Sequence, residues 1–139
     1  KGVQMGTRFV ATNECDADDS FKQAFVQAKK KDLTIIKSPV GLPGRAIRSP
    51  FLDSVERGEK IPFKCPWHCL RTCDYTKSPY CISKALVQAR KGNLNHGFAF
   101  AGANAWRVDR IMPVKELMDS LADEYAQSVE YLDSEAASF

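Results

Sequence analysis

The chain begins with an apolar, strand-like run that has no nearby strand to pair with. Within residues 2–10, Val3 and Met5 alternate with Gln4, which is the pattern of a strand buried among neighbours. The next β-branched run, residues 33–36, comes about thirty residues after the first one begins. An unpaired buried strand leaves its backbone N–H and C=O groups unsatisfied. We therefore expect partner strands upstream, and we expect this chain to be a processed or truncated product.

The remainder of the chain favours helices. Ser49 and Pro50 supply an N-cap and a first helical residue, and the same pair recurs at Ser78-Pro79. Elsewhere apolar residues recur at helical spacing. We expect helices over residues 21–28, 50–57, 80–90 and 113–132. The fold class predicted for this chain is mostly α, with one or two short strands.

Composition excludes several classes of partner. With 139 residues and 44% hydrophobic content, the chain can form one domain with its own core. A net charge of +3 is too small to indicate nucleic-acid binding. No apolar run reaches the length of a membrane span, and no signal-peptide pattern is present, so we expect a cytoplasmic protein. Exposed strand edges and an uncovered helix face predict self-association into a homo-oligomer.

Four of the five cysteines, Cys65, Cys69, Cys73 and Cys81, lie within seventeen residues. A soft metal needs several converging thiolates, and clustering in sequence lowers the entropy cost of bringing them together. One interpretation is therefore a metal site, holding either an iron–sulfur cluster or zinc, in which His68 can replace one cysteine. Reduced thiols packed in the fold and disulfides are the other two interpretations.

Hydrolytic chemistry finds no support in the sequence. The only histidines are His68 and His96, and neither has a serine or aspartate at a recognised catalytic spacing. The acidic residues of the last predicted helix fit a solvent-exposed face. Gly6 and Thr7 have two interpretations. The step is a plain strand-to-turn junction, as Gly-Thr pairs commonly are, or it is a ligand site in which Gly6 permits close approach to the backbone and the Thr7 hydroxyl holds a phosphate oxygen.

Three motifs carry a family resemblance: GVQMGTRFVAT at residues 2–12, GRAI at 44–47 and GANAWRV at 102–108. In this order they resemble the FMN-dependent nitronate monooxygenases, also called 2-nitropropane dioxygenases, and the related FMN-dependent enoyl-acyl-carrier-protein reductases. The resemblance covers about residues 2–132 and implies a TIM-type barrel. It divides the chain into the last barrel strand with the flavin-phosphate loop (1–14), a helical insertion (15–112) with a cysteine-rich segment (62–81), and a C-terminal helix and tail (113–139).

The same resemblance implies which residues face the cofactor and the substrate. The flavin contacts would come from Gln4, Met5, Gly6 and Thr7. The small-molecule substrate would lie near Arg45, Gly102 and Asn104. The family's catalytic histidine and glycine-rich phosphate loop belong to an earlier part of the barrel, so we assign no catalytic residue here.

Three functions follow for the whole protein. The first is oxidation of alkyl nitronates with O2 by an FMN-dependent enzyme, of which this fragment alone would be inactive. The second is FMN-dependent reduction of an enoyl-acyl-carrier-protein. The third is of another class, a non-catalytic module in which the cysteine-rich segment binds metal and the helices form an interaction surface.

Overall fold

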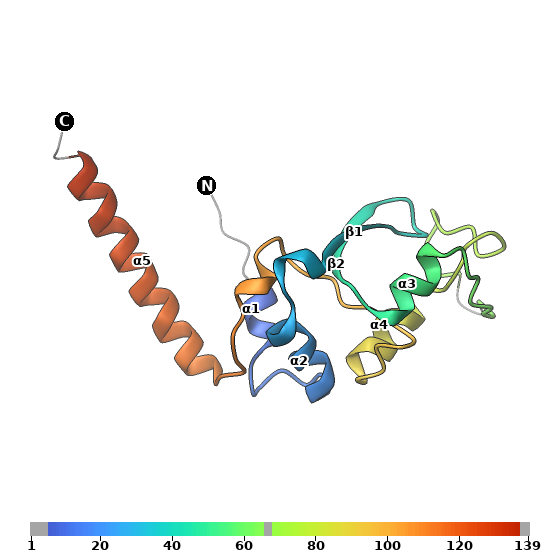
Figure 1. Cartoon of the computed structure of the whole chain (residues 1–139), viewed down its shortest axis with the longest axis horizontal. Coiled ribbons are helices and arrows are strands. Elements are labelled where there is room, and N and C mark those ends of the chain that lie inside the picture. The colour runs from blue at the N-terminus through green and yellow to red at the C-terminus, as the bar shows by residue number, and fades with distance from the viewer. Residues whose placement is uncertain (1–5, 66–67, 137–139) are drawn as a thin grey trace.

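The computed structural model describes residues 6–65 and 68–136. These residues form the helices and strands α1 (Gly6–Val10), α2 (Asp19–Gln27), β1 (Leu33–Lys37), β2 (Pro43–Ile47), α3 (Pro50–Glu56), α4 (Ile82–Arg90) and α5 (Val114–Ala136). Two short 3₁₀ helices, η1 (Lys30–Asp32) and η2 (Ala105–Arg107), complete the order. In Figure 1, α5 projects from one end of the molecule and the irregular segment between α3 and α4 forms the other end. The prediction of a mostly helical chain with short strands is confirmed.

A short antiparallel hairpin lies at the centre of the fold. β1 pairs with β2 in a register that sets Leu33 opposite Ile47 and Ile35 opposite Arg45. On the other edge of β2, residues 99–101 run antiparallel to it. The Ile47 amide donates to the Ala99 carbonyl at 3.0 Å, and the Ala101 amide donates to the Arg45 carbonyl at 3.0 Å. The segment after α4 thus acts as a third, irregular strand.

Alternating side chains of this third strand enter two separate apolar cores. Phe98 lies in the first core, formed by Ala46, Phe51, Leu52, Tyr80, Ala85 and Phe98. Its ring packs near those of Phe51 and Tyr80, at centroid distances of 6.0 and 6.1 Å. Ala99 lies in the second core, formed by Phe25, Ala28, Ile47, Ala99 and Ala105. Because successive side chains point to opposite sides, this one extended segment contributes to both cores and so connects the two halves of the molecule.

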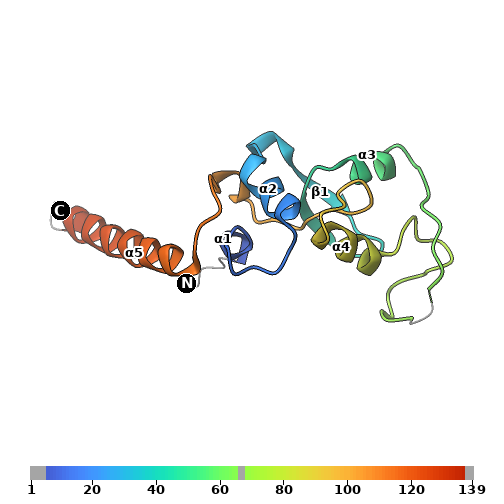
Figure 2. The same ribbon diagram turned by 90° about the horizontal axis from the view of Figure 1, so that it is seen from below.

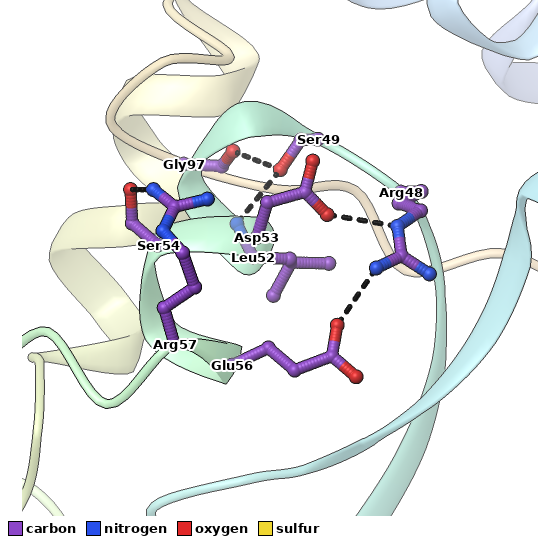
Figure 3. Close-up of polar contacts among 8 residues, drawn as sticks. All are labelled: Arg48, Ser49, Leu52, Asp53, Ser54, Glu56, Arg57 and Gly97. Atoms are coloured by element: carbon purple, nitrogen blue, oxygen red, sulfur yellow. Dashed lines mark hydrogen bonds and ion pairs between the residues drawn. The ribbon is translucent and has the colours of Figure 1, made fainter.

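The predicted Ser49-Pro50 helix start is confirmed and also fixes the third strand. Ser49 caps α3 by accepting from the Leu52 amide at 3.3 Å, and its hydroxyl donates to the Gly97 carbonyl at 3.1 Å (Figure 3). Arg48 reaches Asp53 and Glu56 on the exposed side of α3. Since Ser49 is buried, its hydroxyl needs both partners.

Gly97 packs directly on the backbone of α4. A Cβ placed on Gly97 would lie 2.0 Å from the Ala85 carbonyl oxygen and 2.7 Å from the Ala89 nitrogen. Glycine at this position permits the close approach of the two backbones. No side chain fits between strand and helix.

The predicted opening strand is wrong for the residues that the structure describes. Gly6–Val10 forms α1, while residues 2–5 lie outside the described range. The helical turn aims Val10 into the second core and Arg8 toward α5. The Thr12 hydroxyl then closes the turn by donating to the Phe9 carbonyl at 2.8 Å. These tertiary contacts outweigh the β-propensity of the local sequence.

Another helix start also differs from prediction. α4 begins at Ile82 with Cys81 at its N-cap, so Ser78-Pro79 does not start a helix. Tyr80 instead lies in the first core, where burial raises its pKa to about 12. Lys30 and Lys31 belong to η1, which follows the end of α2 at Gln27.

The predicted last helix is present, but most of its apolar face is uncovered. Leu117 is 1% exposed, whereas Met118 is 52% and Tyr125 is 74% exposed. Figure 2 shows the distal part of α5 extending away from the other elements. Among the described residues, no helix has both the length and the apolar character needed to cross a bilayer.

Replacing Gly97 tests the contact between the third strand and α4. A Gly97→Ala substitution forces the strand off the α4 backbone, and we expect it to lower the free energy of unfolding by about 2–3 kcal/mol. Chemical denaturation of the full-length protein measures this loss. Gly6→Ala is the control, because a Cβ on Gly6 meets no atom within 4 Å. Equal stability of the two variants would contradict the packing described here.

Candidate functional site

Among the described residues, a cleft lies between α1, the segment 102–112 and α5. Its volume is about 780 Å³. Thr7 and Arg8 line it from α1, and Ser120 and Glu124 line it from α5. The segment between η2 and α5 contributes both apolar and charged groups to the lining.

Backbone pairing between distant parts of the chain builds this cleft. The Met112 amide donates to the Ala11 carbonyl at 3.3 Å, and the Asn13 amide donates to the Met112 carbonyl at 3.1 Å. One carboxylate oxygen of Glu14 then accepts from the Val114 amide at 2.9 Å. Glu14 thereby caps the first turn of α5 from a hundred residues away, where a negative charge is favoured. The start of α5 is thus fixed beside α1.

One hydrogen bond joins the predicted cofactor side to the predicted substrate side. The Gly102 amide donates to Thr7 Oγ1 at 3.0 Å, across 95 positions in sequence. Because the oxygen accepts this bond, the Thr7 hydroxyl proton remains available for another acceptor. Thr7 lines the cleft, as do Gly102 and Asn104. A ligand oxygen in the cleft can therefore receive that proton.

Three arginines among the described residues line the cleft, and they differ in whether a carboxylate neutralises their charge. Arg8 donates to Glu124 at 3.0 Å and to Ser120 at 3.0 Å. Arg110 pairs with Glu116 at the start of α5. Arg107 has no carboxylate partner among the described residues; its guanidinium lies over the Trp106 ring, 5.6 Å from the ring centroid. Arg107 is thus the lining cation that a bound anion can engage without displacing a glutamate.

The structure brings together only some of the predicted site residues. Gly6, Thr7, Gly102 and Asn104 lie at or near the cleft, whereas Gln4 and Met5 fall outside the described residues. Arg45 is exposed on β2 opposite Ile35 and is not among the described residues that line the cleft. Its backbone is nevertheless one hydrogen bond from Ala101, next to Gly102. A substrate contact from Arg45 stays a prediction.

The described residues of the cysteine-rich segment form no preformed metal centre. All five cysteines are free thiols, so the disulfide interpretation is wrong. Across residues 6–65 and 68–136, no three His, Cys, Asp or Glu side chains are placed to hold a metal ion. Two of the thiols contact serines: Cys69 Sγ lies 3.9 Å from Ser83 Oγ, and Cys73 Sγ lies 3.7 Å from Ser78 Oγ.

Sequence reasoning missed most of the polar groups that shape the cleft. Arg8, Arg107, Glu14 and Ser120 were assigned no role. Arg8 and Glu124 are 116 positions apart, so no local spacing predicts their pairing. For Glu14 a weak indication existed, because α5 has no cap among its own neighbours. A helix start without a local cap calls for a distant acceptor.

Comparison with known proteins gives a consistent result. The family model described as nitronate monooxygenase matches residues 1–124. A "probable nitronate monooxygenase" from Staphylococcus saprophyticus is 35% identical over 63 residues, which is 45% of this chain and 18% of the relative. A (3aS,4S,5R,7aS)-5-hydroxy-7a-methyl-1-oxo-octahydro-1H-indene-4-carboxyl-CoA dehydrogenase from Rhodococcus jostii is 34% identical over 55 residues, 40% of this chain and 16% of the relative.

A solved structure extends the match to nearly the whole chain. FabK from Thermotoga maritima superposes with a TM-score of 0.74 at 30% identity, covering 96% of this chain and 40% of FabK. FabK is a TIM-barrel protein, and the fold of this chain is part of such a barrel. The chain spans less than half the length of the relatives named here.

The Arg110–Glu116 pair predicts how the start of α5 responds to acid. The hydrogen bond and charge of Arg110 lower the pKa of Glu116 below its ordinary 4.5. The pair therefore stabilises the fold above pH 4.5, the ordinary value, and this contribution is lost as pH falls through the lower folded value. A carboxyl NMR titration should show the depressed pKa, and Arg110→Met should raise it toward 4.5.

Lys115→Met is the matched control for that titration. Lys115 neighbours Glu116 in sequence but pairs with Asp119 at 2.7 Å. We expect the Glu116 pKa to stay low in this variant. An equal rise in both variants would mean that general charge on α5, and not the Arg110 contact, sets the pKa.

Proposed function

The chain belongs to the nitronate monooxygenase family, and from this premise we propose that it forms one side of the FMN site in a flavin-dependent oxidoreductase. The proposal rests chiefly on the hydrogen bond from the Gly102 amide to Thr7 Oγ1, at 3.0 Å. This bond connects the two segments in which the family resemblance is strongest. It also sets the Thr7 hydroxyl as a donor at the edge of the cleft.

The residues that line the cleft fit the phosphate end of FMN. An anionic oxygen is matched by a hydroxyl donor at Thr7 and by the guanidinium of Arg107, the arginine without a described acidic partner. A Cβ on Gly102 would lie 3.2 Å from Thr7 Oγ1, so glycine keeps the amide close enough to donate. FMN, when bound, supplies the redox chemistry. The residues of this chain bind and orient its phosphate.

For the reaction itself, we favour oxidation of alkyl nitronates with O2. The family description and the relatives called "probable nitronate monooxygenase" support this choice. Asn104 lines the same cleft as Thr7 and carries no side-chain hydrogen bond at the start of η2. Its side-chain amide can therefore hydrogen-bond to a small polar substrate beside the flavin.

Reduction of an enoyl thioester is the second candidate. FabK, an enoyl-acyl-carrier-protein reductase, superposes on 96% of the chain. The Rhodococcus and Mycobacterium tuberculosis relatives are named for a carboxyl-CoA substrate, which is also a thioester. These matches favour an acyl thioester substrate.

Steady-state assays of the full-length protein separate the two reactions. The first proposal predicts O2 consumption with an alkyl nitronate when no nicotinamide is present. NADH oxidation that depends on an enoyl thioester, with no nitronate turnover, would replace it with the second. Turnover of neither substrate by protein loaded with FMN would reject both.

Thr7→Val tests the proposed phosphate contact. The substitution removes a hydrogen bond to a charged oxygen, and we expect the Kd for FMN to rise about tenfold. The substitution also removes the acceptor of the Gly102 amide, which should affect both flavins alike. The Kd for riboflavin, which makes no phosphate contact with Thr7, should therefore change less than about threefold. Fluorescence titration of the full-length apoprotein with both flavins measures the two effects.

Thr34→Val serves as the control for this substitution. Thr34 is a half-buried residue of β1, opposite Ala46 and outside the cleft lining. Both flavins should bind this variant as they bind the wild type. Equal losses of FMN and riboflavin affinity in Thr7→Val would show that Thr7 supports the fold and not the phosphate.

A further inference from the structure

The proposed flavin site leaves the cysteine-rich segment unexplained. Cys65, Cys69, Cys73 and Cys81 lie between α3 and α4, at the end of the molecule opposite α5 (Figure 1). The described part of residues 57–81 contains turns but no helix or strand. A segment with so little regular structure needs another source of order.

Three of the four thiols gather around the start of α4. Cys81 is the N-cap residue of this helix. Cys69 Sγ lies 3.9 Å from the hydroxyl of Ser83 in the first turn. Cys73 Sγ lies 3.7 Å from the hydroxyl of Ser78, three positions before Cys81. The chain therefore already folds back so that Cys69 and Cys73 contact serines within residues 78–83, the stretch that contains Cys81.

The fourth thiol is within reach of the same place. The Ile61 amide donates to the Pro79 carbonyl at 2.8 Å, which fixes residues 61 and 79 side by side. Cys65 follows Ile61 by four residues, a span of at most about 14 Å when fully extended. Pro79 precedes Cys81 by only two residues. A modest closure of the turns can thus bring Cys65 to the other three.

The exposure of these thiols argues against a purely structural role. Free cysteine is among the most buried residue types when it only fills space. Here Cys69 is exposed, and Cys65, Cys73 and Cys81 are only half-buried. Four accessible thiols without disulfides are instead typical of ligands that await a metal.

The charge around the segment complements a thiolate centre. Between residues 60 and 84 the basic side chains are Lys60, Lys64, Arg71, Lys77 and Lys84, and the only acidic one is Asp74. Four thiolates around a divalent metal carry a net charge of about −2, which this local excess of cations stabilises. His68 is held by a different contact, since its ring packs edge-on against Tyr75 at 4.3 Å.

We propose that Cys65, Cys69, Cys73 and Cys81 form a four-thiolate site for a soft metal, either zinc or an iron–sulfur cluster, at the N-terminal end of α4. The described residues hold no three of these ligands in place, so binding must draw the turns together and order the segment. The short loops between the cysteines keep the entropy cost of this closure small. This site is independent of flavin binding.

Metal analysis of the anaerobically purified full-length protein tests the site. We expect about one zinc per chain, or about four irons with four acid-labile sulfides. Cys73→Ser should lose at least about nine-tenths of this metal, because three thiolates hold it far less tightly. Cys15→Ser is the matched control, since Cys15 lies outside the segment, and it should keep the full amount.

A second measurement covers the case in which Cys73→Ser fails to fold. Titration of the metal-free wild-type protein with Co2+ should give thiolate charge-transfer absorption and the visible bands of a tetrahedral site. Limited proteolysis should cut residues 57–81 readily without metal and slowly with it. Purified protein without zinc or iron, together with no thiolate bands on adding Co2+, would overturn the proposal.

Discussion

The extended segment 97–102 is the constraint on which the rest of this structure depends. Gly97 presses on the α4 backbone and accepts from Ser49, and Phe98 and Ala99 then enter different cores. At its far end the Gly102 amide reaches Thr7. Because successive side chains of an extended segment point to opposite sides, one short run can join two cores and still deliver its last amide to the cleft. Neither core is complete without this segment.

The same segment explains why the candidate site needs distant parts of the chain. Thr7 and Gly102 are 95 positions apart, and Glu14 caps α5 across a similar distance. The helices between these residues pack together and return the chain to the neighbourhood of α1. The cleft therefore results from the packing of the elements that lie between Thr7 and Gly102 in sequence. The cysteine-rich segment lies outside these packed helices and requires its own source of order.

Local sequence predicted those features that local chemistry decides. The Ser49-Pro50 start, the strand at 33–37 and the final helix were all found, because a cap, a β-branched run and a periodic apolar face each act within a few residues. The opening strand failed at Gly6–Val10, where contacts of Val10 and Arg8 with remote elements favour a helix. For the site, family motifs identified Thr7 and Gly102, but nothing local predicted Arg107 or the distant cap from Glu14. Ion pairs and caps between remote elements leave no periodic trace in sequence.

We propose that the segment returning to Thr7 completes a phosphate-binding site. Amide hydrogen exchange at Gly102 in the full-length protein tests it most directly, because that amide donates to Thr7 Oγ1. Bound FMN should slow the exchange at Gly102 well beyond the effect of riboflavin, since only FMN engages the Thr7 hydroxyl through a phosphate. Equal protection by the two flavins, or no protection by FMN, would contradict the account.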